Sequence, residues 1–174
     1  ENSSIKKNTT KETFKALPTD FFTSCSDDEA YNYIFKAIEL TKEYEPRSIQ
    51  LIASLLLIEK NTKMNRILQI LTGEGKTIII SIIAAYLVHK KHKVDIITSS
   101  EVLANQSYNE TVEFFELLKI TVGSNCDQKA DIRTRKPKKE IYTYDVVYGT
   151  SHSFEADILS DEYEKTGVRN GRPF

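Results

Sequence analysis

The segment RILQILTGEGKTIIISIIAAYL, residues 66–87, holds the most informative pattern in this 174-residue chain. The chain has six glycines, and two of them, Gly73 and Gly75, lie on either side of one glutamate directly before Lys76 and Thr77. Runs rich in isoleucine and leucine flank this group, in a setting where glycine costs backbone entropy and packs nothing. The glycines therefore indicate a special turn of the backbone.

The flanking runs predict a strand before this turn and a helix after it. RILQIL, residues 66–71, is a short apolar run bounded by glycine, which is typical of a buried parallel strand. Residues 76–90 form a longer run that contains the small pair Ala84 and Ala85, so we predict a helix although isoleucine lowers helix propensity. The apolar part of that run, residues 77–88, is shorter than the roughly 18 residues of a membrane-spanning helix.

A strand, a glycine turn and a helix together are the setting of a phosphate-binding loop. Glycines let the backbone N–H groups converge at the positive end of the following helix, where a phosphate binds well. In that pattern Lys76 reaches the β- and γ-phosphates and Thr77 ligates Mg²⁺. The loop departs from the strict G-x-x-x-x-G-K-[ST] pattern because Ile70 stands at its first position. The alternative is an ordinary turn with a solvated lysine, and the flanking elements favour the phosphate loop.

Strands alternate with helices along the rest of the chain, which predicts an α/β domain built on a parallel sheet. Residues 1–25 are polar and are expected to be an extended or disordered lead-in. A helix over residues 27–44 begins with Ser26 and Glu29 as a capping box. Other helices are expected at 46–60, buried on more than one side, at 101–119 after the cap Ser100, and at 151–159 with Ser151 as its start and cap. Strands are expected at 93–100, 120–123 and 141–150, and a loop at 161–174.

Composition and charge indicate a globular domain and argue against a protein that binds polyanions through its overall charge. Hydrophobic residues make up 40% and charged residues 28%, as in ordinary globular domains, and the net charge of −1 argues against a polyanion binder. The basic run from Lys129 to Lys139 has no interleaved aromatic residues, so we expect a solvated loop there; binding of RNA phosphates or an acidic membrane surface is the alternative.

The two cysteines, Cys25 and Cys126, have no metal-like spacing and are expected to be free thiols of a reducing compartment.

Four segments resemble, in the same order, the first nucleotide-binding domain of the SecA-type preprotein translocase ATPases. One is TGEGKT, residues 72–77, and the others are residues 28–54, 94–110 and 144–159. The resemblance spans about residues 29–174. The residues it retains outside the loop are Pro46 and Gln50 in the first of these segments, Thr98, Leu103 and Ala104 in the next, and Asp145, Tyr148, Gly149, Thr150, Phe154, Asp157 and Leu159 in the last.

The resemblance implies a RecA-like P-loop domain, here a partial one with an N-terminal helical lead-in, with ATP and Mg²⁺ as its ligands. By the family pattern, Lys76 is the catalytic candidate, Thr77 the Mg²⁺ ligand and Gln50 the residue that reads adenine. The family's phenylalanine before this glutamine falls at Arg47, so stacking on adenine would come from Arg47 or Tyr44. The remaining candidates for nucleotide binding are Thr72, Gly73, Glu74 and Gly75.

The resemblance also predicts what lies around this domain. In the family, a segment like residues 169–174 leads into a strand that ends in Asp-Glu, the Walker B pair, whose acids hold Mg²⁺ and orient water. We expect residues 26–174 to stop before that strand, and the isolated chain to bind nucleotide weakly and to hydrolyse it negligibly. Asp161 and Glu162 lack a preceding apolar strand and are interpreted as surface carboxylates. Expected partners are a second RecA-like domain, an unfolded preprotein and a membrane channel, at a cytoplasmic location that includes the membrane periphery.

Two alternatives stay open. A DEAD-box-type RNA helicase core shares the fold, the glutamine motif and the loop, but residues 98–106 read TSSEVLANQ where such helicases favour P-T-R-E-L, so nucleic acid is not the expected partner. The chain also departs from the SecA pattern at Ser107 and at Glu155 and Ala156. These departures keep a degenerate SecA-like nucleotide-binding or interaction module as the second alternative.

Overall fold

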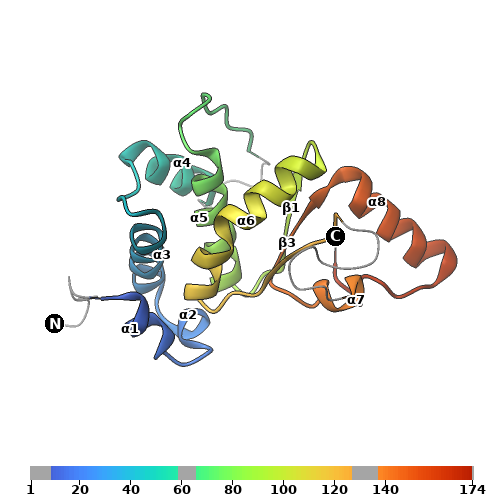
Figure 1. The fold of residues 1–174 in the computed structure, drawn as a ribbon, viewed down its shortest axis with the longest axis horizontal. Helices are drawn as coiled ribbons and strands as arrows, with labels where there is room; N and C mark the ends of the chain where they lie inside the picture. Colours follow the sequence, from blue (N-terminus) through green and yellow to red (C-terminus); the bar gives the residue numbers. More distant parts are fainter. Residues whose placement is uncertain (1–8, 59–65, 127–136, 174) are drawn as a thin grey trace. The chain divides into compact units, whose positions relative to one another are not determined.

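The computed structural model describes residues 9–58, 66–126 and 137–173 of the chain (Figure 1). The chain divides into two compact units, residues 1–90 with 117–119, and residues 91–116 with 120–174. The first unit contains the helices α1 (Lys11–Lys15), α2 (Phe21–Ser24), α3 (Asp27–Lys42), α4 (Ser48–Ile58) and α5 (Lys76–His89). The second contains β1 (Val94–Thr98), α6 (Glu101–Leu117), β2 (Val122–Ser124), α7 (Lys138–Ile141), β3 (Val146–Thr150), α8 (Ser151–Leu159) and the π-helix η1 (Ser160–Glu164).

Helix α5 lies at the centre of the first unit, because α2, α3 and α4 all contact it. Its side chains are buried around most of its circumference, which outweighs the weak helix propensity of isoleucine and confirms the predicted helix. The buried apolar residues of this helix are Ile78, Ile79, Ile82, Ala84, Ala85, Tyr86 and Val88.

The predicted capping box at the start of α3 is present. The Glu29 backbone N–H donates to Ser26 Oγ at 3.4 Å, and the Ser26 N–H donates to Glu29 Oε2 at 2.9 Å. The segment before it differs from the extended lead-in that we expected, because residues 11–15 form α1 and residues 21–24 form α2. Phe14, Phe21 and Phe22 explain the difference, since their rings are buried and make edge contacts with one another.

Asp27 joins the start of α3 to the end of α5. Its carboxylate accepts hydrogen bonds from Tyr86 Oη at 3.2 Å and from Lys90 Nζ, and lies 3.0 Å from His89 Nε2. The other ring nitrogen of His89, Nδ1, lies 2.8 Å from the Phe22 carbonyl oxygen, so the same imidazole also contacts α2. The hydrogen bond from Lys90, followed by that from His89, lowers the pKa of Asp27 to about 2.

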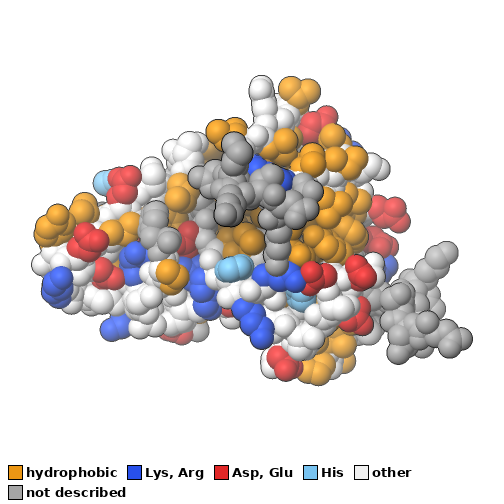
Figure 2. Space-filling view, turned by 180° about the vertical axis from the view of Figure 1, so that it is seen from behind, with side chains coloured by type: hydrophobic (Ala, Val, Ile, Leu, Met, Phe, Trp, Pro, Cys, Tyr) orange, Lys and Arg blue, Asp and Glu red, His pale blue; other side chains and the backbone are white. Residues whose placement is uncertain are grey.

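Helix α4 is less buried than we predicted. Only Gln50, Ala53 and Ser54 of this helix are buried, and this narrow face of small and polar residues lets α4 and α5 pack together. An apolar run does not reveal which side of a helix faces a partner. Figure 2 shows hydrophobic side chains gathered on the surface of the first unit. The half-exposed apolar residues of α4 are Ile49, Ile52, Leu55 and Leu56.

A parallel sheet of three strands, in the order β1-β3-β2, organises the described part of the second unit. All five residues of the central strand β3 are buried, as expected for a parallel strand covered on both faces. Side chains of β3, α7 and α8 form one apolar cluster of Ile141, Tyr142, Val147 and Phe154. The predicted α/β class with a parallel sheet flanked by helices is therefore confirmed.

The predicted strand over residues 66–71 is wrong. These residues form no strand, Ile67 is fully exposed, and Leu71 is 71% exposed. A strand exists only by pairing with a neighbour, and the described pairs of the sheet involve β1, β2 and β3 alone. An apolar run bounded by glycine is therefore compatible with a strand but does not guarantee one.

Three boundaries in the second unit also differ from prediction. The expected strand over 141–150 begins only at Val146, because α7 continues into turn hydrogen bonds such as the Tyr144 N–H to the Ile141 carbonyl oxygen at 2.9 Å. The cap of α8 is Thr150 and not Ser151, since Thr150 is still extended and its Oγ1 accepts from the Ser153 N–H at 3.1 Å. Residues 161–164, expected to be loop, belong to η1.

A buried polar network links α7 to α8. Lys138 Nζ donates to Asp157 Oδ1 at 2.8 Å, and Tyr142 Oη donates to Asp157 Oδ2 at 2.6 Å. Burial, reinforced by the hydrogen bond to Asp157, raises the pKa of Tyr142. Asn125 Nδ2 donates to Tyr142 Oη at 2.8 Å, and a β-carbon at Gly149 would lie only 2.0 Å from Asn125 Oδ1. Glycine is therefore required at this position of β3.

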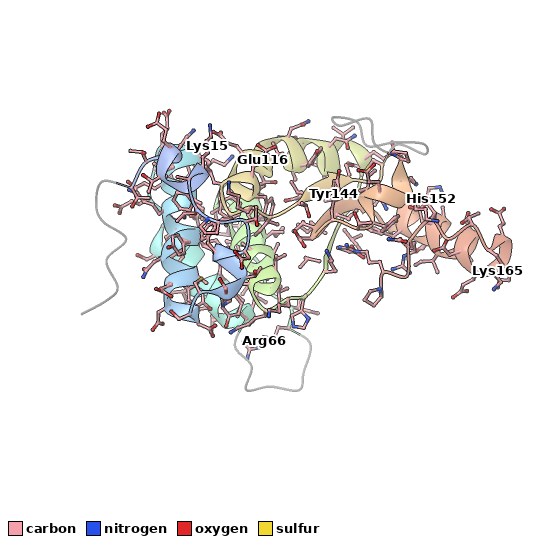
Figure 3. All side chains as sticks on the ribbon, turned by 90° about the horizontal axis from the view of Figure 1, so that it is seen from below. Lys15, Arg66, Glu116, Tyr144, His152 and Lys165 are labelled. Atoms are coloured by element: carbon pink, nitrogen blue, oxygen red, sulfur yellow. The ribbon has the colours of Figure 1, made fainter. Side chains whose placement is uncertain are left out.

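Arg172 binds the starts of two strands at once. Its Nε donates to Asp95 Oδ1 at 2.8 Å, and its Nη2 donates to the Val94 carbonyl oxygen at 2.8 Å. The same guanidinium also donates to the carbonyl oxygens of Tyr144 and Asp145, just before β3. Tyr144, whose carbonyl oxygen is one of these acceptors, is labelled in Figure 3. Burial raises the pKa of Asp95, and Arg172 opposes that rise.

Other expectations concern single residues. Cys25 and Cys126 are free, as predicted. Most of the basic run lies outside the described residues, and of its two described lysines Lys138 is buried on Asp157 whereas Lys139 is exposed. In the described ranges no helix is long and apolar enough to cross a membrane. The same ranges contain no cluster of three or more His, Cys, Asp or Glu side chains that could hold a metal ion.

The Asp27 contacts predict an acid-dependent part of stability. A carboxylate whose pKa is lower in the folded state stabilises the protein above its unfolded pKa of about 4, and this contribution is lost as the pH falls toward about 2. Asp27→Asn should therefore lower the free energy of unfolding at pH 6, and its difference from wild type should shrink below pH 4. Urea unfolding between pH 6 and 3 measures this.

Asp28→Asn is the matched control, because Asp28 is an exposed residue of the same first helical turn. It keeps all partners of Asp27 and should change stability little at any of these pH values. Equal losses in the two variants would show that the charge of the helical turn, and not the contacts of Asp27, is responsible.

Candidate phosphate-binding site

The glycine turn has the backbone that its sequence predicts. Gly73 and Gly75 have φ angles of +87° and +78°, in the left-handed region that residues with a side chain rarely adopt. A turn hydrogen bond joins the Glu74 N–H to the Leu71 carbonyl oxygen at 3.3 Å. Figure 3 labels Arg66 at the start of the described segment that leads into this turn.

Helix α5 begins directly after the turn, at Lys76. Its N-cap is Gly75, which offers no capping side chain, so the first turn of the helix keeps backbone N–H groups for another acceptor. The Ile78 and Ile79 N–H groups donate to the Gly75 carbonyl oxygen at 3.0 and 3.2 Å. The positive end of the dipole of a 14-residue helix therefore coincides with the turn, which suits an anion.

Lys76, the candidate phosphate-binding lysine, is exposed. Its Nζ donates to the Leu71 carbonyl oxygen at 3.1 Å, so the side chain binds the residue that precedes the turn. Thr77, the expected Mg²⁺ ligand, is the next residue and is partly exposed; its carbonyl oxygen accepts from Ser81 Oγ at 2.7 Å inside α5. The candidate lysine and hydroxyl therefore stand next to each other at the start of the helix.

Gln50 lies beneath the turn and is completely buried. Its Nε2 donates to the Glu74 carbonyl oxygen at 2.9 Å, and its Oε1 accepts from the Arg47 N–H at 3.0 Å. Both ends of the amide are therefore engaged within the protein. Because a β-carbon at Gly75 would lie 2.3 Å from Gln50 Nε2, glycine is required there for the close approach as well as for its φ angle.

Arg47 reaches the turn from the residues before α4. Its Nη1 donates to Glu74 Oε2 at 3.1 Å, and its Nη2 donates to the Gly73 carbonyl oxygen at 3.2 Å. Arg47 and Glu74 stay partly in contact with water, with side chains 55% and 37% exposed. Tyr44 is 47% exposed, and among the described residues no hydrogen bond or ring contact joins it to the turn.

The structure therefore brings most of the candidate site residues together in one unit. Gln50, Arg47 and Glu74 contact one another through the turn, and Lys76 and Thr77 follow it. Sequence analysis missed the Arg47–Glu74 ion pair and the role of the Leu71 carbonyl oxygen. Opposite charges 27 positions apart do not indicate a contact in a chain with many charged residues, and nothing in the sequence indicated a backbone acceptor.

The glycine turn, the helix start and a parallel sheet are found in α/β domains of the P-loop class, but residues 66–71 do not form the strand expected before the turn. Comparison of sequences shows which family it is: the family described as the SecA DEAD-like domain matches residues 3–170. The chain belongs to this family. The match begins well before residue 29, where the resemblance seen in the sequence began.

Curated relatives carry the same family name. The protein translocase subunit SecA of Aliarcobacter butzleri is 28% identical over 137 residues, which cover 75% of this chain and 15% of that protein. SecA 2 of Listeria welshimeri is 34% identical over 113 residues, or 65% of this chain and 13% of that protein. SecA of Helicobacter pylori is 31% identical over 113 residues, with 65% and 12% covered. The chain thus matches only a small part of the length of these relatives.

A solved structure supports the fold. S. cerevisiae Dbp5, in a complex with Nup159, Gle1, IP6 and ADP, matches 76% of this chain and 33% of its own chain with a TM-score of 0.55. The sequence identity of 22% makes this a similarity of fold alone. It agrees with the RecA-like class expected from the sequence.

The two glycines of the turn provide a test of this geometry. Gly73→Ala should lower the free energy of unfolding by about 1–2 kcal/mol, the cost of a left-handed residue with a side chain. Gly75→Ala should cost about 1–3 kcal/mol more, because the new methyl group displaces the buried Gln50 amide from its hydrogen bond. Urea unfolding of the two variants measures the difference.

Gly73 is the matched control here, because a β-carbon at that position meets no atom within 4 Å while its φ angle is just as unusual. Equal losses in the two variants would show that Gln50 does not press against the turn in solution.

Proposed function

We propose that this chain is the ATP-binding part of a SecA-type ATPase motor, which couples ATP hydrolysis to the movement of polypeptide. The observation that carries the proposal is the turn of residues 73–75 at the start of α5, followed by an exposed lysine, in a member of the SecA DEAD-like family. Because the chain matches at most 15% of the length of these relatives, the activity is assigned to the longer protein.

The residues fit a nucleotide's phosphates. The backbone N–H groups from Gly73 to Thr77 and the Lys76 ammonium group would bind the β- and γ-phosphates, with Thr72 at the edge of the loop. The Thr77 hydroxyl would hold Mg²⁺, an ion that takes one or two protein oxygens and completes its shell with phosphate oxygens and water. When bound, Mg²⁺ neutralises charge that develops on the phosphate oxygens.

The adenine base would lie beside α4. Gln50 is the family's adenine-reading residue, but both ends of its amide bind the protein, so reading the base would require at least one of these bonds to be exchanged. Tyr44 is the better candidate for stacking on adenine than Arg47, since its ring is half exposed whereas the Arg47 guanidinium is held by the turn.

We infer the neighbouring domain, the partners and the location from the family to which the chain belongs. Residues 26–174 would form the N-terminal part of the first nucleotide-binding domain, and a second RecA-like domain of the same protein would complete the ATPase site. An unfolded preprotein and a membrane channel are the proposed partners, and the cytoplasmic side of a membrane is the proposed location. ATP or ADP is the proposed ligand.

Nucleotide binding is tested by titrating the 174-residue chain with a fluorescent ADP in the presence of Mg²⁺. We expect weak binding and negligible ATP hydrolysis. Lys76→Ala should weaken binding by about ten- to a hundredfold, because it removes charge-assisted hydrogen bonds to phosphate. Lys15→Ala, an exposed lysine at the end of α1 (Figure 3), is the control and should bind as wild type does. ATP turnover by the chain alone that Lys76→Ala abolishes would contradict the expected absence of a complete catalytic site.

The helicase alternative and the degenerate-module alternative are separated by one measurement on the full-length protein. A SecA-type motor should hydrolyse ATP faster in the presence of unfolded polypeptide and show no response to single-stranded RNA. Stimulation by RNA would favour the helicase, and nucleotide binding without turnover under either condition would favour the degenerate module.

A further inference from the structure

The loop is closed on itself in this structure. The Leu71 carbonyl oxygen accepts from both the Glu74 N–H, at 3.3 Å, and Lys76 Nζ, at 3.1 Å. These are two of the donors that a phosphate-binding loop offers to its ligand. A carbonyl oxygen of the protein therefore takes the role of the phosphate oxygen, and Lys76 must exchange this partner before it holds an anion.

Arg47 holds the same loop from outside. One guanidinium donates to the Glu74 carboxylate and to the Gly73 carbonyl oxygen, so it fastens two consecutive residues of the loop to the start of α4. The two charged residues are 27 positions apart in the sequence. Because both side chains are partly exposed, the pair is weak enough to be broken by a competing ligand.

A bound polyphosphate would compete with Glu74 for Arg47. Glu74 belongs to the loop that would surround the phosphates, so its carboxylate is a negative group inside an anion site. A phosphate offers a guanidinium two parallel hydrogen bonds, whereas in this structure Arg47 makes a single hydrogen bond to the Glu74 carboxylate. Transfer of Arg47 from Glu74 to phosphate would release the loop and add a ligand contact in one step.

The geometry points to an Arg47–Glu74 latch that closes the phosphate loop in the absence of nucleotide and that polyphosphate opens by taking over Arg47. The latch rests on the proposed nucleotide-binding function and adds a regulatory element to that site. Arg47 then binds the phosphates and not the adenine base. Its role therefore differs from the stacking on adenine expected of the phenylalanine that the family has at this position.

Glu74→Asp tests the latch in the full-length protein, with Mg²⁺-pyrophosphate and Mg²⁺-ADP as the probes in calorimetric titrations. Aspartate keeps the negative charge but is one methylene shorter, so it loses the 3.1 Å contact with Arg47. If the pair is a latch, the affinity for both probes should rise about two- to fivefold, which is the change in affinity that the free energy of one exposed ion pair produces. If Glu74 acts only by its charge, the affinity should stay the same or fall.

Arg47→Gln provides the matched background. Without Arg47 there is no latch to break, so Glu74→Asp should then leave the affinity for pyrophosphate within about 1.5-fold, below the range of an exposed ion pair. A rise of the same size in both backgrounds, or no rise in either, would overturn the latch. Thermal unfolding of each variant confirms that the exposed substitutions leave the fold intact.

The same titrations distinguish the latch from the function beneath it. If wild-type protein binds ADP, Lys76→Ala abolishes that binding, and Glu74→Asp has no effect, the latch alone is wrong. If neither the wild type nor any of these variants binds either probe, the nucleotide-binding function is wrong, and the latch is wrong with it.

Discussion

The first unit depends on the close approach of the Gln50 amide to the backbone of Gly75. A left-handed glycine at this position ends the turn and begins α5, and the approach leaves no space for a β-carbon. The amide is completely buried, so its two hydrogen bonds are made in a setting of low dielectric, where they are strong and where losing one is costly. The start of the central helix is therefore held against one side chain of a different helix.

Beyond this contact, α5 packs against other helices along its whole length. The helix is buried around most of its circumference, and at its C-terminus His89 and Lys90 bind Asp27 at the start of α3. The two ends differ in chemistry: the first has backbone N–H groups, a lysine and an exposed turn, and the last has a paired carboxylate. The C-terminal end of α5 is therefore fixed to α3 by charged side chains, whereas the N-terminal end is held mainly through backbone atoms of the turn.

Features that depend on neighbours in the sequence were predictable, and features that depend on distant partners were not. The capping box of Ser26 and Glu29 and the glycine turn involve residues within a few positions, and both were expected. Residues 66–71 have the composition of a strand, but a strand also needs a pairing partner, which composition does not report. Thr150 and Ser151 are both suitable caps, and the end of β3 decides between them. The Arg47–Glu74 pair spans 27 positions, too far for any local pattern to specify.

Arg172 has a consequence for where the chain can be shortened. One guanidinium donates to Asp95, to the carbonyl oxygen of Val94 at the start of β1, and to two carbonyl oxygens just before β3. Residues that follow η1 therefore stabilise the sheet and are not a tail. A truncation that removed Arg172 would leave the partly buried Asp95 carboxylate without this cation and several carbonyl oxygens at the strand starts without this donor. A shortened version of this chain must therefore retain Arg172, two places before the last residue, if the sheet is to keep these contacts.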